Sequence, residues 1–134
     1  MSKEVLVGRF DATIDSKGKV KLPEEWGFAF GPGKLIYIVP AADDHSLSVM
    51  PAQCWNEALA ELREKALFDP KLGAALKKIG EESRMCTVSS DGTIELDGKM
   101  LERGHLKGLV SFIGCYQNAK LYATENLSPN GAEK

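Results

Sequence analysis

A cluster of lysines on a predicted β-hairpin is the feature of this sequence most able to do chemistry. Lys17, Lys19 and Lys21 alternate with Gly18 and Val20. Because side chains alternate between the two faces of a strand, the three ammonium groups would share the face opposite Val20. Ammonium groups contact phosphate as point charges, so this face could bind the backbone of a nucleic acid. A solvated outer face of a hairpin explains the same pattern without any partner.

The turn that carries these lysines holds residues that stabilise a tight reversal. Asp15 can accept hydrogen bonds from backbone amides two residues further on, and Gly18 tolerates a positive φ. Arg9 precedes Phe10, which alternation places inward, so Arg9 should point outward. It could join the lysines or pair with a carboxylate. We therefore take Asp15 and Gly18 as turn-bracing residues, and Arg9 and the three lysines as candidate DNA contacts.

No catalytic or metal-binding pattern appears elsewhere. His45 and His105 are far apart in sequence, and no His–carboxylate–His spacing supports a metal site. Residues 31–34 lack the spacing of a phosphate loop and read better as a turn before a strand. The cysteines have no CxxC spacing and no visible activating base, which favours small core side chains: Cys54, Cys86 and Cys115. We therefore expect no enzyme, no metal, no cofactor and no small-molecule substrate.

An internal repeat organises the chain. A shift of 74 residues lays residues 10–50 over residues 84–124 without a gap, with similarity mainly in the apolar pattern. Gly18 then falls on Gly92, Leu22 on Leu96 and Leu35 on Leu109. We divide the chain into a first repeat (5–50), a helical linker (51–83), a second repeat (84–124) and a flexible tail (125–134).

Each copy is predicted to contain a hairpin, a short helical segment and two further strands. The predicted strands of the first copy are residues 10–14, 20–22, 35–39 and 47–49. Those of the second copy are residues 86–88, 93–96, 109–113 and 120–123. In the second copy Asp97 should cap a helix over residues 98–103, which Gly104 would end. A unit of this size buries little surface alone, so it must pack against its twin or another chain.

The linker contains the only long helical patterns. Apolar residues recur at helical spacing from Trp55 to Ala66, and Asp69-Pro70 is a good start for a second helix that Gly80 would end. Trp26 and Trp55 are expected to anchor the core or an interface.

The overall charge restricts any contact with nucleic acid to a local surface. The chain holds 17 Lys+Arg against 19 Asp+Glu, a net charge of −2, whereas nucleic-acid binders usually have a basic excess. The first hairpin is nevertheless locally basic, while its counterpart over residues 89–93 carries Asp91 and no cation. No apolar run approaches the length of a membrane span and no signal peptide is visible, so we expect a cytoplasmic protein without a membrane partner.

Residues 8–10 and 13–23 resemble the first signature of the MraZ family, whose core is Asp-x-x-x-Arg with Gly before the Arg. Trp55, residues 67–70 and residues 80–82 also resemble this family, so the resemblance covers residues 5 to about 125. It implies an α+β fold in which two AbrB-like swapped-hairpin repeats form a small β-barrel, with a helical pair between them. It also implies ring-shaped homo-oligomers and a nucleoid-associated transcriptional regulator or repressor. Such proteins bind promoter DNA of a cell-division and cell-wall gene cluster.

By this resemblance Asp15 would brace the turn, Lys19 would take the Arg position, and Arg9 would match an Arg before the first aromatic residue. The chain departs from the family at Lys19, which lacks the bidentate fork of Arg, and at Ser89 and Thr93, which replace the Asp and the Arg in the second copy. Three hypotheses therefore stay open: a DNA-binding regulator, a diverged oligomeric module for structure or protein interaction, and an enzyme or small-ligand sensor on a small barrel.

Overall fold

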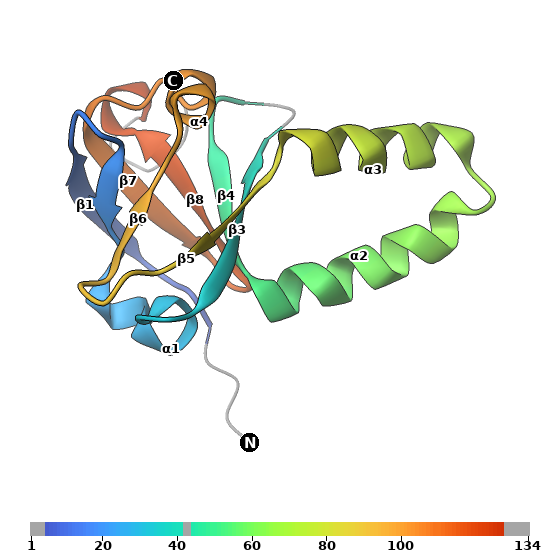
Figure 1. The fold of residues 1–134 in the computed structure, drawn as a ribbon, viewed down its shortest axis with the longest axis horizontal. Coiled ribbons are helices and arrows are strands. Elements are labelled where there is room, and N and C mark those ends of the chain that lie inside the picture. Colours follow the sequence, from blue (N-terminus) through green and yellow to red (C-terminus); the bar gives the residue numbers. More distant parts are fainter. Residues whose placement is uncertain (1–4, 42–43, 128–134) are drawn as a thin grey trace.

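The structure, a computed structural model, describes residues 5–41 and 44–127. A six-stranded antiparallel sheet has the order β1-β7-β8-β4-β3-β5. A two-stranded sheet of β2 and β6 lies beside it (Figure 1). The strands of the large sheet are β1 (Arg9–Ile14), β3 (Leu35–Pro40), β4 (Leu47–Pro51), β5 (Arg84–Thr87), β7 (Gly108–Cys115) and β8 (Asn118–Ala123).

The strands of the two predicted hairpins pair differently from the prediction. β1 pairs with β7, and β5 pairs with β3, while β2 (Lys19–Lys21) pairs with β6 (Thr93–Glu95). Each hairpin thus closes at its turn, but its strands form their ladders with strands from the other half of the chain. The pairing that alternation suggested within each hairpin was wrong, whereas the exchange of partners agrees with the swapped hairpins that the family resemblance implies.

A short helical segment follows the second strand of each hairpin. Glu24–Trp26 forms a 3₁₀ turn that leads into α1 (Gly27–Phe30), and α4 (Gly98–Arg103) follows β6. The predicted cap of α4 is confirmed, since the Asp97 carboxylate accepts a hydrogen bond of 2.9 Å from the amide of Met100. Figure 1 shows α1 and α4 at opposite ends of the strands.

Aromatic side chains cluster around Trp26 in the core. Trp26 is 2% exposed, and its ring lies edge-on to Phe10, with the centroids 4.9 Å apart. Phe30 and Phe112 pack against the same indole. The indole nitrogen donates a hydrogen bond of 3.1 Å to the carbonyl of Val7, so its polar edge is satisfied. Trp26 is therefore the core anchor that the sequence predicted.

Two helices project from the barrel as an arm, α2 (Ala52–Ala66) and α3 (Pro70–Glu82) (Figure 1). The Asp69 side chain accepts from the amides of Lys71 and Leu72, as predicted for a cap. The predicted stop at Gly80 was wrong. The helix continues to Glu82, where Ser83 closes it through its amide and hydroxyl, both bonded to the carbonyl of Ile79.

The predicted α+β class is confirmed, and the arrangement is consistent with a small β-barrel-like fold. Residues 9–51 and 84–123 run through the same order of elements, which agrees with a duplicated unit. The division into repeats and linker stays a prediction. Thr124–Asn126 forms a short 3₁₀ turn, and the rest of the predicted tail lies largely outside the described residues.

Candidate nucleic-acid interface

The turn of the first hairpin is organised around one carboxylate. Oδ1 of Asp15 accepts hydrogen bonds of 2.9 Å from the amides of both Lys17 and Lys19. The amide of Asp15 also donates to the carbonyl of Lys19, which closes the turn. The amide of Lys19 chiefly holds the pKa of Asp15 below its usual range, against a smaller opposing effect of desolvation. The Asp15 carboxylate thus makes its hydrogen bonds within the turn, and the side chains of Lys17 and Lys19 are exposed.

Gly18 fits this turn tightly against the other half of the chain. Its φ is +85°, and its carbonyl accepts a 2.9 Å hydrogen bond from the amide of Leu96. A β-carbon at this position would lie 2.3 Å from the carbonyl oxygen of Leu96. Only glycine meets both the positive φ and this close approach.

The second turn has a similar backbone and a different electrostatic character. Gly92 has a φ of +80°, and its carbonyl accepts a 2.9 Å hydrogen bond from the amide of Leu22. The hydroxyls of Ser89 and Thr93 both donate to the Asp91 carboxylate. These two hydrogen bonds hold the pKa of Asp91 below its usual range, so this turn presents a negative charge.

The two turns stand at opposite ends of the ribbon formed by β2 and β6, which we call the hairpin ribbon. The Gly18–Leu96 and Gly92–Leu22 contacts fix each turn against the end of the partner strand. Figure 1 shows the blue turn of the first hairpin and the gold turn of the second at the two ends of one side of the molecule. Four residue steps separate Gly18 from Leu22, which is about 13 Å of strand.

The three predicted lysines are spread along the hairpin ribbon. Lys17 lies in the first turn. Lys19 is opposite Glu95 in the register. Lys21 is opposite Thr93, at the end nearer the second turn, and its ammonium group is 3.1 Å from the carboxylate of Glu24. The lysines share the exposed face with carboxylates, so this surface is less basic than the isolated hairpin sequence suggests.

Arg9 does not lie at the first turn. It begins β1, whereas the turn begins after the last residue of that strand, about 17 Å further along. Its Nε is 3.4 Å from the Asp11 carboxylate, which matches the alternative that it pairs with an acid.

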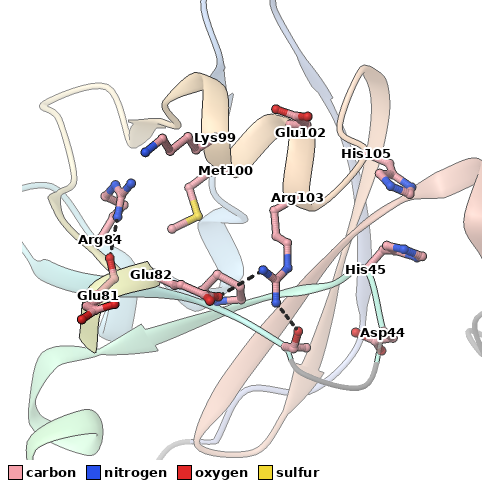
Figure 2. Close-up of a pocket in the computed structure, with 12 residues that line it drawn as sticks. Asp44, His45, Glu81, Glu82, Arg84, Lys99, Met100, Glu102, Arg103 and His105 are labelled. Carbon is pink, nitrogen blue, oxygen red and sulfur yellow. Dashed lines mark hydrogen bonds and ion pairs between the residues drawn. The ribbon is translucent and has the colours of Figure 1, made fainter. Parts of the chain in front are cut away.

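A charged cleft of about 660 Å³ is the other candidate site (Figure 2). It lies between α4, the end of α3 and the loop that follows β3. Its principal cations are already engaged. Arg103 contacts the Glu82 carboxylate at 3.1 Å and donates to the carbonyl of Ala41, and Arg84 contacts Asp97 at 2.7 Å.

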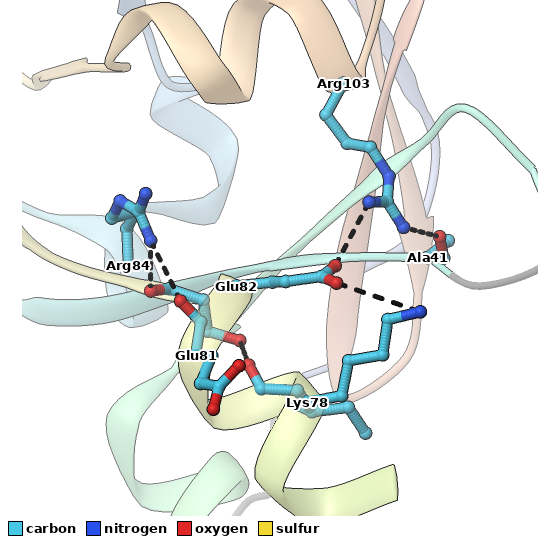
Figure 3. A network of polar contacts seen from close by, with 8 residues as sticks. Ala41, Lys78, Glu81, Glu82, Arg84 and Arg103 are labelled. Atoms are coloured by element: carbon cyan, nitrogen blue, oxygen red, sulfur yellow. Dashed lines mark hydrogen bonds and ion pairs between the residues drawn. The ribbon is translucent and has the colours of Figure 1, made fainter.

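These contacts join the end of α3 to α4 (Figure 3). Glu82, the last residue of α3, lies 3.1 Å from Arg103 and 4.0 Å from Lys78. Arg84 also donates to the carbonyls of Glu81 and Ser83. Arg84 therefore links the end of α3 to Asp97, the cap of α4. The charged side chains of the cleft thus connect α3 to α4.

Sequence spacing gave no sign that the two histidines meet. The rings of His45 and His105 stack with their centroids 4.1 Å apart at the edge of the cleft (Figure 2). The carboxylate of neighbouring Asp44 accepts hydrogen bonds from the amide of Ser46 and the hydroxyl of Tyr122. Within residues 5–41 and 44–127, no three His, Cys, Asp or Glu side chains come together as a metal site.

All three cysteines are free thiols with intermediate exposure. Cys86 packs against the core, as predicted, whereas Cys54 and Cys115 line a surface cavity of about 320 Å³. Burial raises the pKa of Cys54 and Cys86. A raised pKa lowers the thiolate fraction, which disfavours a nucleophilic role for these two residues.

Comparison with known proteins gives a consistent result. The chain is 22% identical over 123 residues to a protein of Thermomicrobium roseum, covering 91% of this chain and 84% of the relative. It is 24% identical over 128 residues to one of Hyphomonas neptunium, covering 92% and 76%. A relative from Bacteroides thetaiotaomicron is 23% identical over 122 residues, covering 89% and 78%. No family model matches the chain.

These relatives share one description. Seven curated proteins match in total, and every one is named "Transcriptional regulator MraZ". The matches cover about nine-tenths of this chain and so include both hairpins and the arm. They point to the MraZ family, which confirms the resemblance predicted from the first hairpin. In the described part of the chain, no helix is long and apolar enough to cross a membrane.

Proposed function

We propose that the protein is a DNA-binding transcriptional regulator that contacts DNA through its hairpin ribbon. The observation that carries this proposal is the exposure of Lys17, Lys19 and Lys21 along one ribbon, in a chain similar throughout to proteins named as transcriptional regulators. Asp15 and Gly18 hold the first turn so that its lysines face solvent. Ammonium groups on such a surface bind phosphate by releasing condensed counterions, so binding should fall steeply with salt.

Within this proposal the protein is a ring-shaped homo-oligomer. One ribbon with few cations binds weakly, but linked copies along one duplex can raise avidity by about 10²–10⁴. The arm supports self-association because none of the residues in its helices is fully buried. At its tip, Leu67 and Phe68 are 78% and 90% exposed. Large apolar side chains with this exposure are typical of protein interfaces.

The target that fits this proposal is promoter DNA, by analogy with the cell-division and cell-wall cluster that the family resemblance implies. The protein would then act in the cytoplasm, associated with the nucleoid, as a repressor or regulator. Neither the hairpin ribbon nor the turns offer an Arg fork for bidentate contact with guanine. Lysine contacts and the geometry of the ribbon would therefore carry recognition.

A mobility-shift experiment tests the proposal. The duplex is the region upstream of the protein's own gene, and the salt concentration is varied from about 50 to 300 mM. The combined substitutions Lys17→Glu and Lys19→Glu should abolish binding. The matched control, Lys71→Glu with Lys77→Glu, makes the same charge change on the exposed arm. Light scattering is used to check that this control still assembles, and the assembled control should bind as the wild type does. Normal binding by the ribbon variant would refute the assignment of the ribbon.

The charges that oppose the lysines support a second candidate, a diverged oligomeric module without specific DNA binding. Glu95 stands opposite Lys19, Glu24 pairs with Lys21, and Asp91 makes the second turn negative. Selection from random duplexes at low salt distinguishes the two functions. Enrichment of a sequence favours the regulator, and no enrichment by an intact oligomer favours the module.

A further inference from the structure

Two lysines that the first-hairpin pattern does not include lie at the ends of the hairpin ribbon. At the second turn, Gly33 donates a 2.8 Å hydrogen bond to the carbonyl of Val88, and the amide of Val88 donates a 2.9 Å bond to the carbonyl of Lys34. Two successive residues thus oppose one, which defines a β-bulge, and Gly33 takes the positive φ of +83° that such a bulge requires. The bulge turns Lys34 outward, and its side chain is exposed immediately beside the second turn.

Lys107 lies close to the first turn. It precedes Gly108, whose register partner is Ile14, the residue directly before Asp15. Lys107 directly precedes β7, and its side chain is exposed. Leu106 is held in place by a 2.9 Å hydrogen bond to the carbonyl of Leu101, which fixes the approach to this position.

Neither Lys34 nor Lys107 has an ion-pair partner among residues 5–41 and 44–127. Each also stands next to a turn whose single carboxylate is already hydrogen-bonded within the turn. Both ammonium groups are therefore available for an external anion.

The length of the ribbon suits a phosphate contact at each end. The positions of Gly18 and Leu22 mark its two ends, about 13 Å apart. Phosphates of one DNA strand are spaced by about 3.4 Å along the helix axis, so this length corresponds to about four phosphates.

We infer that Lys34 and Lys107 each contact a backbone phosphate of duplex DNA, so that the interface uses both ends of the hairpin ribbon. Lys34 then supplies at the second turn the cation that Thr93 and Asp91 do not. Lys21 assists it, because the ribbon register places Lys21 beside Thr93, with its side chain close to Gly92. This inference rests on the proposed function and adds to it two lysines outside β2 and β6, one near each end of the ribbon.

Fluorescence anisotropy with a labelled duplex tests it. The variants Lys34→Gln and Lys107→Gln each remove one charge at an exposed position, and Lys71→Gln removes one charge on the arm as the control. The affinity is measured over a salt series. Each ribbon variant should reduce the slope of log K against log salt by about 1 for every subunit in contact, and Lys71→Gln should leave the slope unchanged. Light scattering and thermal melting confirm that each variant keeps its fold and assembly.

The outcomes separate the two levels of the proposal. A wild-type chain that does not bind at low salt overturns the proposed function itself. If the wild type binds and the combined Lys17→Glu and Lys19→Glu variant does not, the proposed function stands. In that case, an unchanged slope in either Lys34→Gln or Lys107→Gln overturns the two-ended interface.

Discussion

The two hairpins have nearly the same backbone and carry opposite charge. Both turns have a glycine with positive φ, and each glycine carbonyl binds an amide at the end of the other hairpin. In the first turn, the Asp15 carboxylate accepts hydrogen bonds from two backbone amides, and two lysine side chains are exposed. In the second turn, the Asp91 carboxylate accepts hydrogen bonds from two hydroxyls, and the turn contains no cation. The comparison shows that the requirements of the fold fix the backbone of the turn, while the side chains within it remain free to determine what the surface binds.

The largest effect should come from replacing the glycine of the first turn. Gly18→Ala places a β-carbon 2.3 Å from the carbonyl oxygen of Leu96 and imposes a positive φ on alanine. Positive φ costs about 1–2 kcal/mol and overpacking about 1–3 kcal/mol more. Gly92→Ala meets only Lys21, at 3.9 Å, so it should cost about 1–2 kcal/mol. Chemical denaturation measures both, and equal losses would show that the turns are packed alike.

Copying the first turn into the second should change binding next most. Ser89→Asp, Asp91→Lys and Thr93→Lys together give residues 89–93 the sequence of residues 15–19. The variant should bind duplex DNA more tightly at low salt, with a slope steeper by about 2 per subunit in contact. Ser89→Asp alone is the control for the altered turn. An unchanged slope in the triple variant would mean that the second turn does not approach DNA.

Acid should weaken the second half of the chain through a specific carboxylate. The amide of Met100 and the guanidinium of Arg84 hold the pKa of Asp97 below its usual range. A lowered folded-state pKa stabilises the protein above the ordinary pKa of about 3.8, and this stabilisation is lost as the pH falls through the lower value. Asp97→Asn should therefore flatten the fall in unfolding free energy as the pH is lowered below about 5. Denaturation at each pH measures this, and an unaltered pH dependence would contradict the assignment.

The smallest effect concerns a contact made at the end of α4. Arg103 joins α4 to Glu82 at the root of the arm, whereas the residue 74 positions earlier in the chain is Ala29, in α1. Because this ion pair is partly exposed, Arg103→Ala should cost no more than about 1 kcal/mol. It should raise hydrogen exchange at the end of α3 and leave the end of α1 unchanged. Equal increases in hydrogen exchange at both helix ends would show that the effect of the Arg103–Glu82 ion pair is not local.

Local features of the fold were predictable from the sequence, and contacts across the chain were not. Asp69 and Asp97 cap helices, and Gly18 takes a positive φ, because these preferences depend on a few neighbouring residues. The exchange of strand partners depends on packing between segments more than 70 residues apart, so alternation within each hairpin could not reveal it.

The same limit applied to the candidate site. The sequence identified Lys17 and Lys19, but the charge around them depends on Glu95, which reaches Lys19 only through the pairing of β2 with β6. The internal repeat contained a usable signal for this pairing. The 74-residue offset relates Val20 to Ile94, and these two residues lie opposite each other where β2 pairs with β6. The stacked histidines lay in two loops without periodicity and had no such signal.

Footprinting of lysines by acetylation and mass spectrometry tests the central claim most directly, because it reports on every lysine of the intact protein at once. With duplex DNA bound, Lys17 and Lys19 on the hairpin ribbon should be protected from acetylation. Lys71 and Lys77 on the arm should react as they do without DNA. Protection of the arm lysines with no change at the ribbon would contradict the account.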